Sequence, residues 1–303
     1  MNVCLTPEFD HSANIAVNGR VQHDAGNRMN KIATTLFCAA ALFFAVISEA
    51  ADMETVAVIG TGDMGDSLGP RFAELGYRVV YGSRTPESDK VKALVKKTGE
   101  NASATTQMAA AQQGDIVLLL VPWPPMETVA QNLGNLNGKI IVDVSMPLEQ
   151  DEDGYPSHLL QTSSAEMIQG WNPGAKVVKA IGTMGSYLID DPTAAGGMVT
   201  IPVASDHRDA KEKVAGIVAA LGLDPVDFGP RRMARNIEVM QLIYMIPLSQ
   251  NRPEGWEFYF RRNDYYGCYL DRGSNVEGLV PVYDSEDLAV FPQSGDKPTP
   301  CPQ

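Results

Sequence analysis

Apolar runs alternate with stretches of helical periodicity along most of the chain. Short apolar or β-branched runs that predict strands occur at 55–60, 77–83, 115–122, 139–145, 176–183 and 198–204. Stretches that predict helices end near Leu75, cover 88–99, begin at Met126, and cover 206–222 and 231–248. Two of the strands, 115–122 and 139–145, are apolar on both faces, as in a buried parallel sheet. The pattern predicts an α/β fold with a doubly wound, mostly parallel sheet and helices on both of its faces.

Two of the predicted helices have features of their own. Asp206 precedes the helix over 206–222 and is expected to be its N-cap. The stretch 231–248, RRMARNIEVMQLIYMIPL, is predicted to be a mostly buried closing helix. Beyond it the chain becomes rich in aromatic residues, arginine and asparagine, and we expect loops there.

A glycine-rich turn joins the first predicted strand to the first predicted helix. It reads Gly60-x-Gly62-x-x-Gly65, within VAVIGTGDMGDSLG. In a strand–turn–helix setting the first glycine permits a tight turn, the second lets backbone N–H groups approach a pyrophosphate, and the third allows close helix packing. The N-terminus of the helix adds a partial positive charge. The sequence therefore predicts a Rossmann-type dinucleotide-binding domain.

The residues at the end of the second predicted strand indicate whether the dinucleotide is NAD or NADP. Folds that bind NAD usually place Asp or Glu there, to bind the ribose 2′-hydroxyl. Ser83 and Arg84 stand at this position instead. A hydroxyl and a guanidinium hold a 2′-phosphate through charge-assisted hydrogen bonds, whereas a carboxylate repels it. The sequence therefore predicts NADP as the cofactor.

Later strands end at the same edge of the predicted sheet. Pro122 ends the predicted strand over 115–122 and Trp123 follows it. The two residues either line the dinucleotide site or form a rigid apolar loop. Ser145 ends the strand over 139–145, and the segment 182–188 follows the next strand. Ligands of open α/β sheets bind at the carboxyl ends of the strands. We therefore expect these segments to form the wall of a cleft for a second substrate.

The N-terminus has the layout of a signal for export. Residues 29–51 contain a basic start at Lys31, an apolar run over 32–47 and small residues up to Ala51. Cleavage there would give a periplasmic or secreted protein without a stable membrane span. Two alternatives stay open, namely an uncleaved anchor and a cytoplasmic protein that starts at Met53. We predict four segments: a leader over 1–51, an NADP-binding domain over 52–190, a small substrate-side α/β portion over 191–249, and a loop-rich, aromatic and Pro-rich extension with a tail over 250–303.

Charge and reactive residues narrow the classes of function. The formal net charge is −13, which argues against nucleic acid or an anionic membrane as the partner. Cys268 and Cys301 either form a disulfide or stay free thiols, and the chain has no metal-binding motif. No histidine or serine stands in a catalytic motif, so we predict no catalytic side chain. Hydride transfer between two bound redox compounds needs little acid–base chemistry, which fits a small-molecule redox substrate or coenzyme as the partner.

The order of these motifs resembles a known family. AVIGTGDMGDSLGPRFAELGYRVVYGSR, DIVLLLVPW, DVSMPL, KAIGTMG and DAKEKVAGIVAALGLDPVDFGPRRMARNIEVM are similar to the NADP oxidoreductases that use the deazaflavin coenzyme F420, over residues 54 to about 247. The resemblance implies hydride transfer between NADP(H) and F420, in a protein that often forms homodimers. It also implies the site residues. Thr61, Gly62, Asp63 and Met64 would contact the pyrophosphate, Ser83, Arg84 and Ser88 the 2′-phosphate side, Pro122 and Trp123 the dinucleotide, and Ser145, Met146 and Pro147 the nicotinamide or the deazaflavin.

This chain departs from the family pattern at two places. Where the family has an amide side chain after a strand, this chain has Gly182. The extension over 250–303 has no counterpart in the family pattern. Both departures concern the hydride acceptor more than NADP. The alternatives to F420 are therefore another acceptor, such as a metal chelate or an imine, and a non-catalytic dinucleotide-binding sensor or interaction module.

Overall fold

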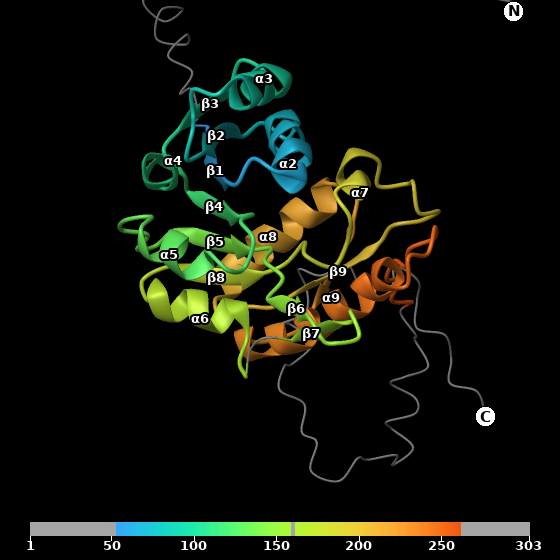
Figure 1. Cartoon of the computed structure of the whole chain (residues 1–303). Coiled ribbons are helices and arrows are strands. Elements are labelled where there is room, and N and C mark those ends of the chain that lie inside the picture. The colour runs from blue at the N-terminus through green and yellow to red at the C-terminus, as the bar shows by residue number, and fades with distance from the viewer. Residues whose placement is uncertain (1–52, 159–160, 262–303) are drawn as a thin grey trace, which may run out of the picture. The chain divides into compact units, whose positions relative to one another are not determined.

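A six-stranded parallel sheet is the centre of the computed structural model, which describes residues 53–158 and 161–261 (Figure 1). Its strands, in spatial order, are β3 (Ala102–Thr105), β2 (Arg78–Gly82), β1 (Thr55–Ile59), β4 (Ile116–Leu119), β5 (Ile140–Asp143) and β8 (Lys176–Lys179). All neighbouring strands pair in parallel. The strand order reverses between β1 and β4, as in Rossmann-type sheets. The doubly wound sheet predicted from the sequence is confirmed.

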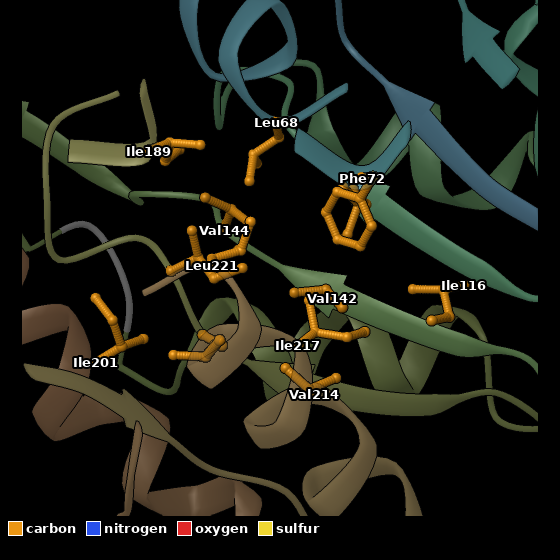
Figure 2. Close-up of a cluster of buried hydrophobic side chains, with 14 of the residues drawn as sticks. Leu68, Phe72, Ile116, Val142, Val144, Ile189, Ile201, Val214, Ile217 and Leu221 are labelled. Atoms are coloured by element: carbon orange, nitrogen blue, oxygen red, sulfur yellow. The ribbon is translucent and has the colours of Figure 1, made fainter. Parts of the chain in front are cut away.

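Helices cover both faces of this sheet. One face carries α2 (Asp63–Glu74), α3 (Asp89–Thr98) and α8 (Arg208–Ala220), and the other carries α4 (Gln107–Gln113), α5 (Met126–Gln131) and α6 (Ser164–Trp171). Figure 2 shows the first of the two cores, in which Phe72 of α2 and Ile217 of α8 lie in one cluster with Val142 of β5. Successive residues of β1 alternate between this core and the one on the other face. Both faces of the strands are therefore apolar.

A smaller α/β portion follows β8. Its elements are α7 (Tyr187–Asp190), the parallel pair of β9 (Thr200–Val203) and β10 (Asp224–Asp227), the 3-10 turn η1 (Arg231–Met233) and α9 (Ala234–Ser249). An isolated bridge between Lys179 and Ala204 joins it to β8. Helix α9 packs against the antiparallel hairpin of β6 (Leu148–Gln150) and β7 (Pro156–His158). The segment 250–261 returns to β9, where the Thr200 N–H donates to the Phe258 carbonyl at 2.7 Å.

The cap expected at Asp206 is wrong. Helix α8 begins at Arg208, and His207 is at its N-cap without a side-chain capping bond. The Asp206 carboxylate instead accepts the backbone N–H of Arg231 at 2.8 Å and pairs with the Arg231 guanidinium at 3.0 Å. Asp206 therefore bonds to Arg231, 25 residues later, and does not cap helix α8.

Other differences arise where the apolar signal is weak. The sequence pattern misses β3, α4, α6 and the β6–β7 hairpin, which are short elements of at most eight residues each. The closing helix predicted over 231–248 begins with the turn η1, and it is less buried than expected. Val239, Ile243 and Leu248 of α9 are exposed, so burial is confined to one side of that helix.

Several expectations fall on residues outside the described ranges. The leader over 1–51, Cys268, Cys301 and all of the extension beyond 261 are among them. The limits of the predicted segments stay predictions. Across the described ranges, no helix is both long and apolar enough to cross a membrane.

Candidate functional site at the carboxyl edge of the sheet

A cavity of about 720 Å³ lies at the carboxyl edge of the sheet, where the strand order reverses. Its walls are the segments 60–62 after β1, 82–85 at the end of β2 and 120–122 after β4, together with Lys90, Gln107, Pro124, Pro125 and Val129. Such switch points are where open α/β sheets bind ligands. The volume is within the range of sites for small molecules and cofactors.

The three glycines of the loop have different structural roles. Gly60 has a φ of +132°, and a Cβ there would lie 2.7 Å from the carbonyl oxygen of Leu120. A Cβ on Gly65 would lie 2.2 Å from the carbonyl oxygen of Gly60, so this position fixes the approach of α2 to β1. A Cβ on Gly62 would meet no protein atom within 4 Å, yet Gly62 lines the cavity. The position beside Gly62 is therefore open to the cavity.

The N-terminus of α2 begins at this loop. Gly62 is its N-cap and provides no side-chain capping bond, which leaves the first N–H groups of the helix for an anion. Thr61 and Gly62 line the cavity. Asp63 is exposed, Met64 is half-buried, and neither lines the cavity. Gly65 is buried beneath the turn.

We call Ser83, Arg84, Thr85 and Lys90, which line one end of the cavity, the basic corner. The Ser83 hydroxyl accepts the Thr85 backbone N–H at 3.1 Å, which folds the turn after β2. Arg84 and Lys90 are exposed, and neither forms an ion pair within the described part of the chain. Two such cations in a net-acidic chain provide a local site for an anion.

Ser88 does not line the cavity. Its hydroxyl is the N-cap of α3 and accepts the Val91 N–H at 3.5 Å. Lys90, two positions further on, lines the cavity instead, whereas Lys92 pairs with Glu87 at 3.3 Å. At the start of α3, the residue that lines the cavity is therefore Lys90 and not Ser88.

The third wall follows β4. Pro122 lines the cavity, whereas Trp123 does not and stacks on Trp171 of α6 with ring centroids 6.1 Å apart. Of the two roles predicted for this loop, Pro122 lies at the cavity and Trp123 packs against a neighbouring helix. Gln107, the first residue of α4, also lines the cavity. Sequence reasoning misses it because it misses α4, although Thr106 before it is a typical N-cap.

Ser145 lies further along the same edge, after β5, and does not line the cavity. It is buried, and its hydroxyl donates to Asp143 Oδ1 at 2.6 Å. Behind it lies a fully buried group that we call the buried cluster, made of Asp143, Ser164, Lys179 and Glu238. Lys179 Nζ lies 3.2 Å from Asp143 Oδ2 and 3.3 Å from Glu238 Oε1, and it donates to the carbonyl of Ser145 at 2.6 Å. The cluster therefore connects α9 to the carboxyl ends of β5 and β8.

Gly182 stands where the family pattern has an amide side chain. In this chain the side-chain amide of Gln241, from helix α9, lies beside Gly182. Gln241 of α9 donates from Nε2 to the carbonyls of Ser145, at 3.1 Å, and Gly182, at 3.0 Å. A Cβ on Gly182 would lie 2.0 Å from this Nε2 and 2.8 Å from the Val144 carbonyl. The preceding residue, Ile181, has a φ of 67°, an uncommon conformation for a branched residue. Gly182 and Gln241 are therefore a matched pair.

We expect Gly182→Asn to lower the free energy of unfolding by about 1–3 kcal/mol, because the new side chain overlaps Gln241. In a double-mutant cycle, Gln241→Ala in the same chain should remove part of this loss, with a coupling of about 1 kcal/mol. Urea denaturation of the four proteins measures the coupling. Strictly additive effects would contradict the matched pair.

The start of the C-terminal extension also reaches this side of the sheet. The Tyr187 hydroxyl of α7 donates to Glu257 Oε1. Burial raises the pKa of the Glu257 carboxyl and that of the neighbouring Tyr244 hydroxyl. The Tyr259 hydroxyl donates to the carbonyl of Ala195. The segment 250–261 is therefore held against the loops that follow β8, which the sequence alone does not indicate.

Comparison with known proteins places these features in a family. A family model described as NADP oxidoreductase, coenzyme F420-dependent, matches residues 55–147. The chain is 28% identical over 187 residues to the metalloreductase STEAP3 of Rattus norvegicus, covering 62% of this chain. It spans only 36% of the length of that metalloreductase.

A solved structure and a second relative agree with the family model. A crystal structure described as a candidate F420-dependent NADP-reductase, from Arthrobacter sp. FB24, superposes with a TM-score of 0.62 at 28% identity, covering 68% of this chain and 99% of that one. The F420-dependent NADP reductase of Methanocaldococcus jannaschii is 30% identical over 196 residues, which cover 60% of this chain and 86% of that protein. At this identity and coverage, the chain belongs to the family of coenzyme F420-dependent NADP oxidoreductases.

Proposed function

We propose that the cavity binds NADP(H) and that the chain transfers a hydride between this dinucleotide and the deazaflavin coenzyme F420. Membership of the family makes the chain an NADP-dependent oxidoreductase. The residues that hold the dinucleotide and the identity of the acceptor are the proposed parts. The hydride itself is supplied by the nicotinamide of NADPH, and the protein provides binding and orientation.

The basic corner is the observation that carries the dinucleotide assignment. Arg84 and Lys90 are exposed at the cavity and form no ion pair within the described residues. Ser83, rather than an acidic residue, follows β2. A 2′-phosphate would satisfy both cations, and NADH lacks this group. The arrangement therefore supports NADP rather than NAD.

The glycine loop supports the placement of the pyrophosphate. The open space beside Gly62 and the uncapped N-terminus of α2 face the same cavity. Backbone N–H groups at a helix N-terminus bind phosphate without a side chain. The pyrophosphate would lie at Thr61 and Gly62, with the 2′-phosphate at the basic corner.

Two acceptors have specific support. The relative at 30% identity is an F420-dependent NADP reductase, which favours the deazaflavin. The similarity to a metalloreductase favours a metal chelate, although the chain spans about a third of that protein, at 36% of its length. The pairing of Gln241 with Gly182 supplies an amide at the place where the family pattern has one, so the departure at Gly182 weighs less against F420.

Reduction assays with a panel of acceptors test the proposed function. The protein is mixed with NADPH and, in separate reactions, with F420, a ferric chelate and a cyclic imine, and NADPH oxidation is followed. We expect F420 to be reduced faster than the other two acceptors. Reduction of the ferric chelate alone would replace the deazaflavin by a metal chelate. Tight NADPH binding without reduction of any acceptor would instead indicate a sensor.

Arg84→Ala should weaken NADPH binding by about 1.5–3 kcal/mol, the range for a hydrogen bond to a charged group. NADH binding should change little, because NADH has no 2′-phosphate. Quenching of the fluorescence of the three tryptophans measures both affinities. Arg78→Ala is the matched control, because Arg78 is exposed at the other end of the same strand. An equal loss of NADPH and NADH affinity would contradict the role of Arg84.

A further inference from the structure

The side-chain amide of Gln107 lies at the cavity without a partner. Gln107 is half-buried and lines the cavity. Within the part of the chain that the structure describes, neither its amide nitrogen nor its amide oxygen forms a hydrogen bond. Gln113 of the same helix, by contrast, donates from Nε2 to the Ala109 carbonyl at 3.0 Å. Gln107 therefore offers a free donor and a free acceptor at the cavity.

Packing between β2 and α4 fixes the place of Gln107. The last residue of β3 pairs with Gly82 of β2, and the next residue, Thr106, caps α4 by accepting the Ala109 N–H at 3.3 Å. A Cβ on Gly82 would lie 3.0 Å from the Cα of Gln107, so the start of α4 packs closely against the end of β2. Gly82 directly precedes Ser83 of the basic corner. Gln107 therefore lies beside the basic corner.

The covalent structure of NADP relates the basic corner to a base. The 2′-phosphate and the adenine are attached to adjacent carbons of the same ribose. A 2′-phosphate held by Arg84 and Lys90 would therefore place the adenine in the neighbouring part of the cavity. With the pyrophosphate at Gly62, the ribose would be constrained from two sides. Gln107 lines this neighbouring part of the cavity, next to the end of β2.

The composition of the cavity wall fits a purine ring. Among the described residues that line the cavity, Gln107 has the only side-chain amide. Apolar side chains account for much of the remaining wall, namely those of Leu120, Val121, Pro122, Pro124, Pro125 and Val129. Adenine is flat and uncharged, and its hydrogen-bonding groups are confined to the edge of the ring. Apolar side chains therefore suit its faces, and a polar side chain suits its edge.

The amide group matches the edge of adenine in its hydrogen-bonding pattern. Adenine presents a donor, its 6-amino group, next to an acceptor, N7. A glutamine amide has the complementary acceptor and donor, Oε1 and Nε2, and pairs with this edge through two hydrogen bonds. Hypoxanthine has a carbonyl oxygen in place of the 6-amino group, so two acceptors face the amide and one hydrogen bond is lost. The two purines are otherwise similar in size and shape.

We propose that Gln107 recognises the adenine of NADP(H), with Oε1 accepting from the 6-amino group and Nε2 donating to N7. The proposal rests on the proposed function, because it concerns how the same cavity holds the dinucleotide. Gln107 determines specificity for the base, as Arg84 and Lys90 determine specificity for the 2′-phosphate. Adenosine 2′,5′-bisphosphate contains both of these groups, so it should bind to the cavity without the nicotinamide.

Titrations with NADPH and with its analogue that carries hypoxanthine in place of adenine test the proposal. The wild type should bind NADPH about 10-fold more tightly than the analogue, the effect of one bidentate pair. Gln107→Met removes the hydrogen bonds and keeps the length of the side chain. This variant should bind NADPH about 10-fold more weakly than the wild type does, and it should bind the two compounds equally.

The matched control for this substitution comes from the same helix. Gln113 is exposed and does not line the cavity. Gln113→Met should therefore keep the wild-type ratio between the two compounds. A variant that is partly unfolded binds both compounds less in the same proportion, so the ratio reports the contact with the base. The ratio measured in the wild type needs no variant at all.

Competition by adenosine 2′,5′-bisphosphate separates this proposal from the proposed function. The compound should displace NADPH from the wild type and should bind about 10-fold more weakly to Gln107→Met. If the wild type prefers NADPH to NADH but binds the hypoxanthine analogue as tightly as NADPH, the role of Gln107 is overturned and the proposed cofactor stands. If the wild type does not bind NADPH, the proposed function fails, and the role of Gln107 fails with it.

Discussion

Gly62→Ala is expected to fold as stably as the wild type and to lose most of its affinity for NADPH. A Cβ at this position meets no protein atom within 4 Å, so the native fold accommodates it. The same Cβ projects into the cavity, beside the uncapped N-terminus of α2, where the pyrophosphate would approach the backbone. We expect a loss of about 100-fold in affinity, or about 3 kcal/mol.

Two measurements separate binding from stability in this variant. Tryptophan quenching gives the dissociation constant for NADPH, and urea denaturation gives the free energy of unfolding. Gly170→Ala is the matched control, because a Cβ on Gly170 also meets no atom within 4 Å, and Gly170 does not line the cavity. Gly65→Ala should instead lose stability, because its Cβ overlaps the Gly60 carbonyl. NADPH binding by Gly62→Ala with unchanged affinity would show that the dinucleotide does not lie at this loop.

Lys179→Met should lower the free energy of unfolding by about 3–5 kcal/mol, the cost of leaving a buried charge without its partner. The substitution leaves Asp143 and Glu238 fully buried without the ammonium that lies within 3.3 Å of both. Urea denaturation at neutral pH measures the loss. The methionine has a similar volume, so a cavity contributes little to the change.

The same strand provides the control for Lys179. Lys176 is the first residue of β8 and pairs with Asp209, whose side chain is 68% exposed. Exposed ion pairs contribute about 0–1 kcal/mol, so Lys176→Met should change stability by no more than that. Equal losses for the two variants would contradict the view that Lys179 neutralises the buried cluster.

The glycine loop and the basic corner, which we propose to bind the dinucleotide, can largely be predicted from the sequence. The roles of Gly60 and Gly65 follow from a local motif that is confined to one turn between β1 and α2. Ser83 and Arg84 follow β2 directly, so their place at the edge of the sheet depends only on the position of one strand. Local pattern and parallel topology together suffice for such residues.

The rest of the site depends on contacts between distant parts of the chain. Ser164 and Glu238 are 74 positions apart, and His158 and Glu238 are 80 apart. No periodicity indicates that such side chains meet. Gln241 places its amide beside Gly182 although it comes 59 residues later in the chain. The sequence alone therefore shows that the amide at position 182 is missing, but not that Gln241 lies beside it. Lys90 and Gln107 reach the cavity from helices whose orientation is fixed by packing in the core.

The acceptor side and the assembly of the protein stay predictions. Exposed Val239, Ile243 and Leu248 on α9 are consistent with the homodimer that the resemblance implies. That the basic corner and the glycine loop hold the dinucleotide is likewise a proposal. The hydride acceptor can be identified by measuring which compound the protein reduces with NADPH.

Titration of the wild-type protein with NADPH and with NADH tests the central claim most directly. Calorimetry of the two titrations gives both dissociation constants under the same conditions. The basic corner predicts that NADPH binds at least about 10-fold more tightly than NADH, the ratio given by about 1.4 kcal/mol from the contacts with the 2′-phosphate. Equal affinities for the two dinucleotides would contradict the assignment of the cavity to NADP(H).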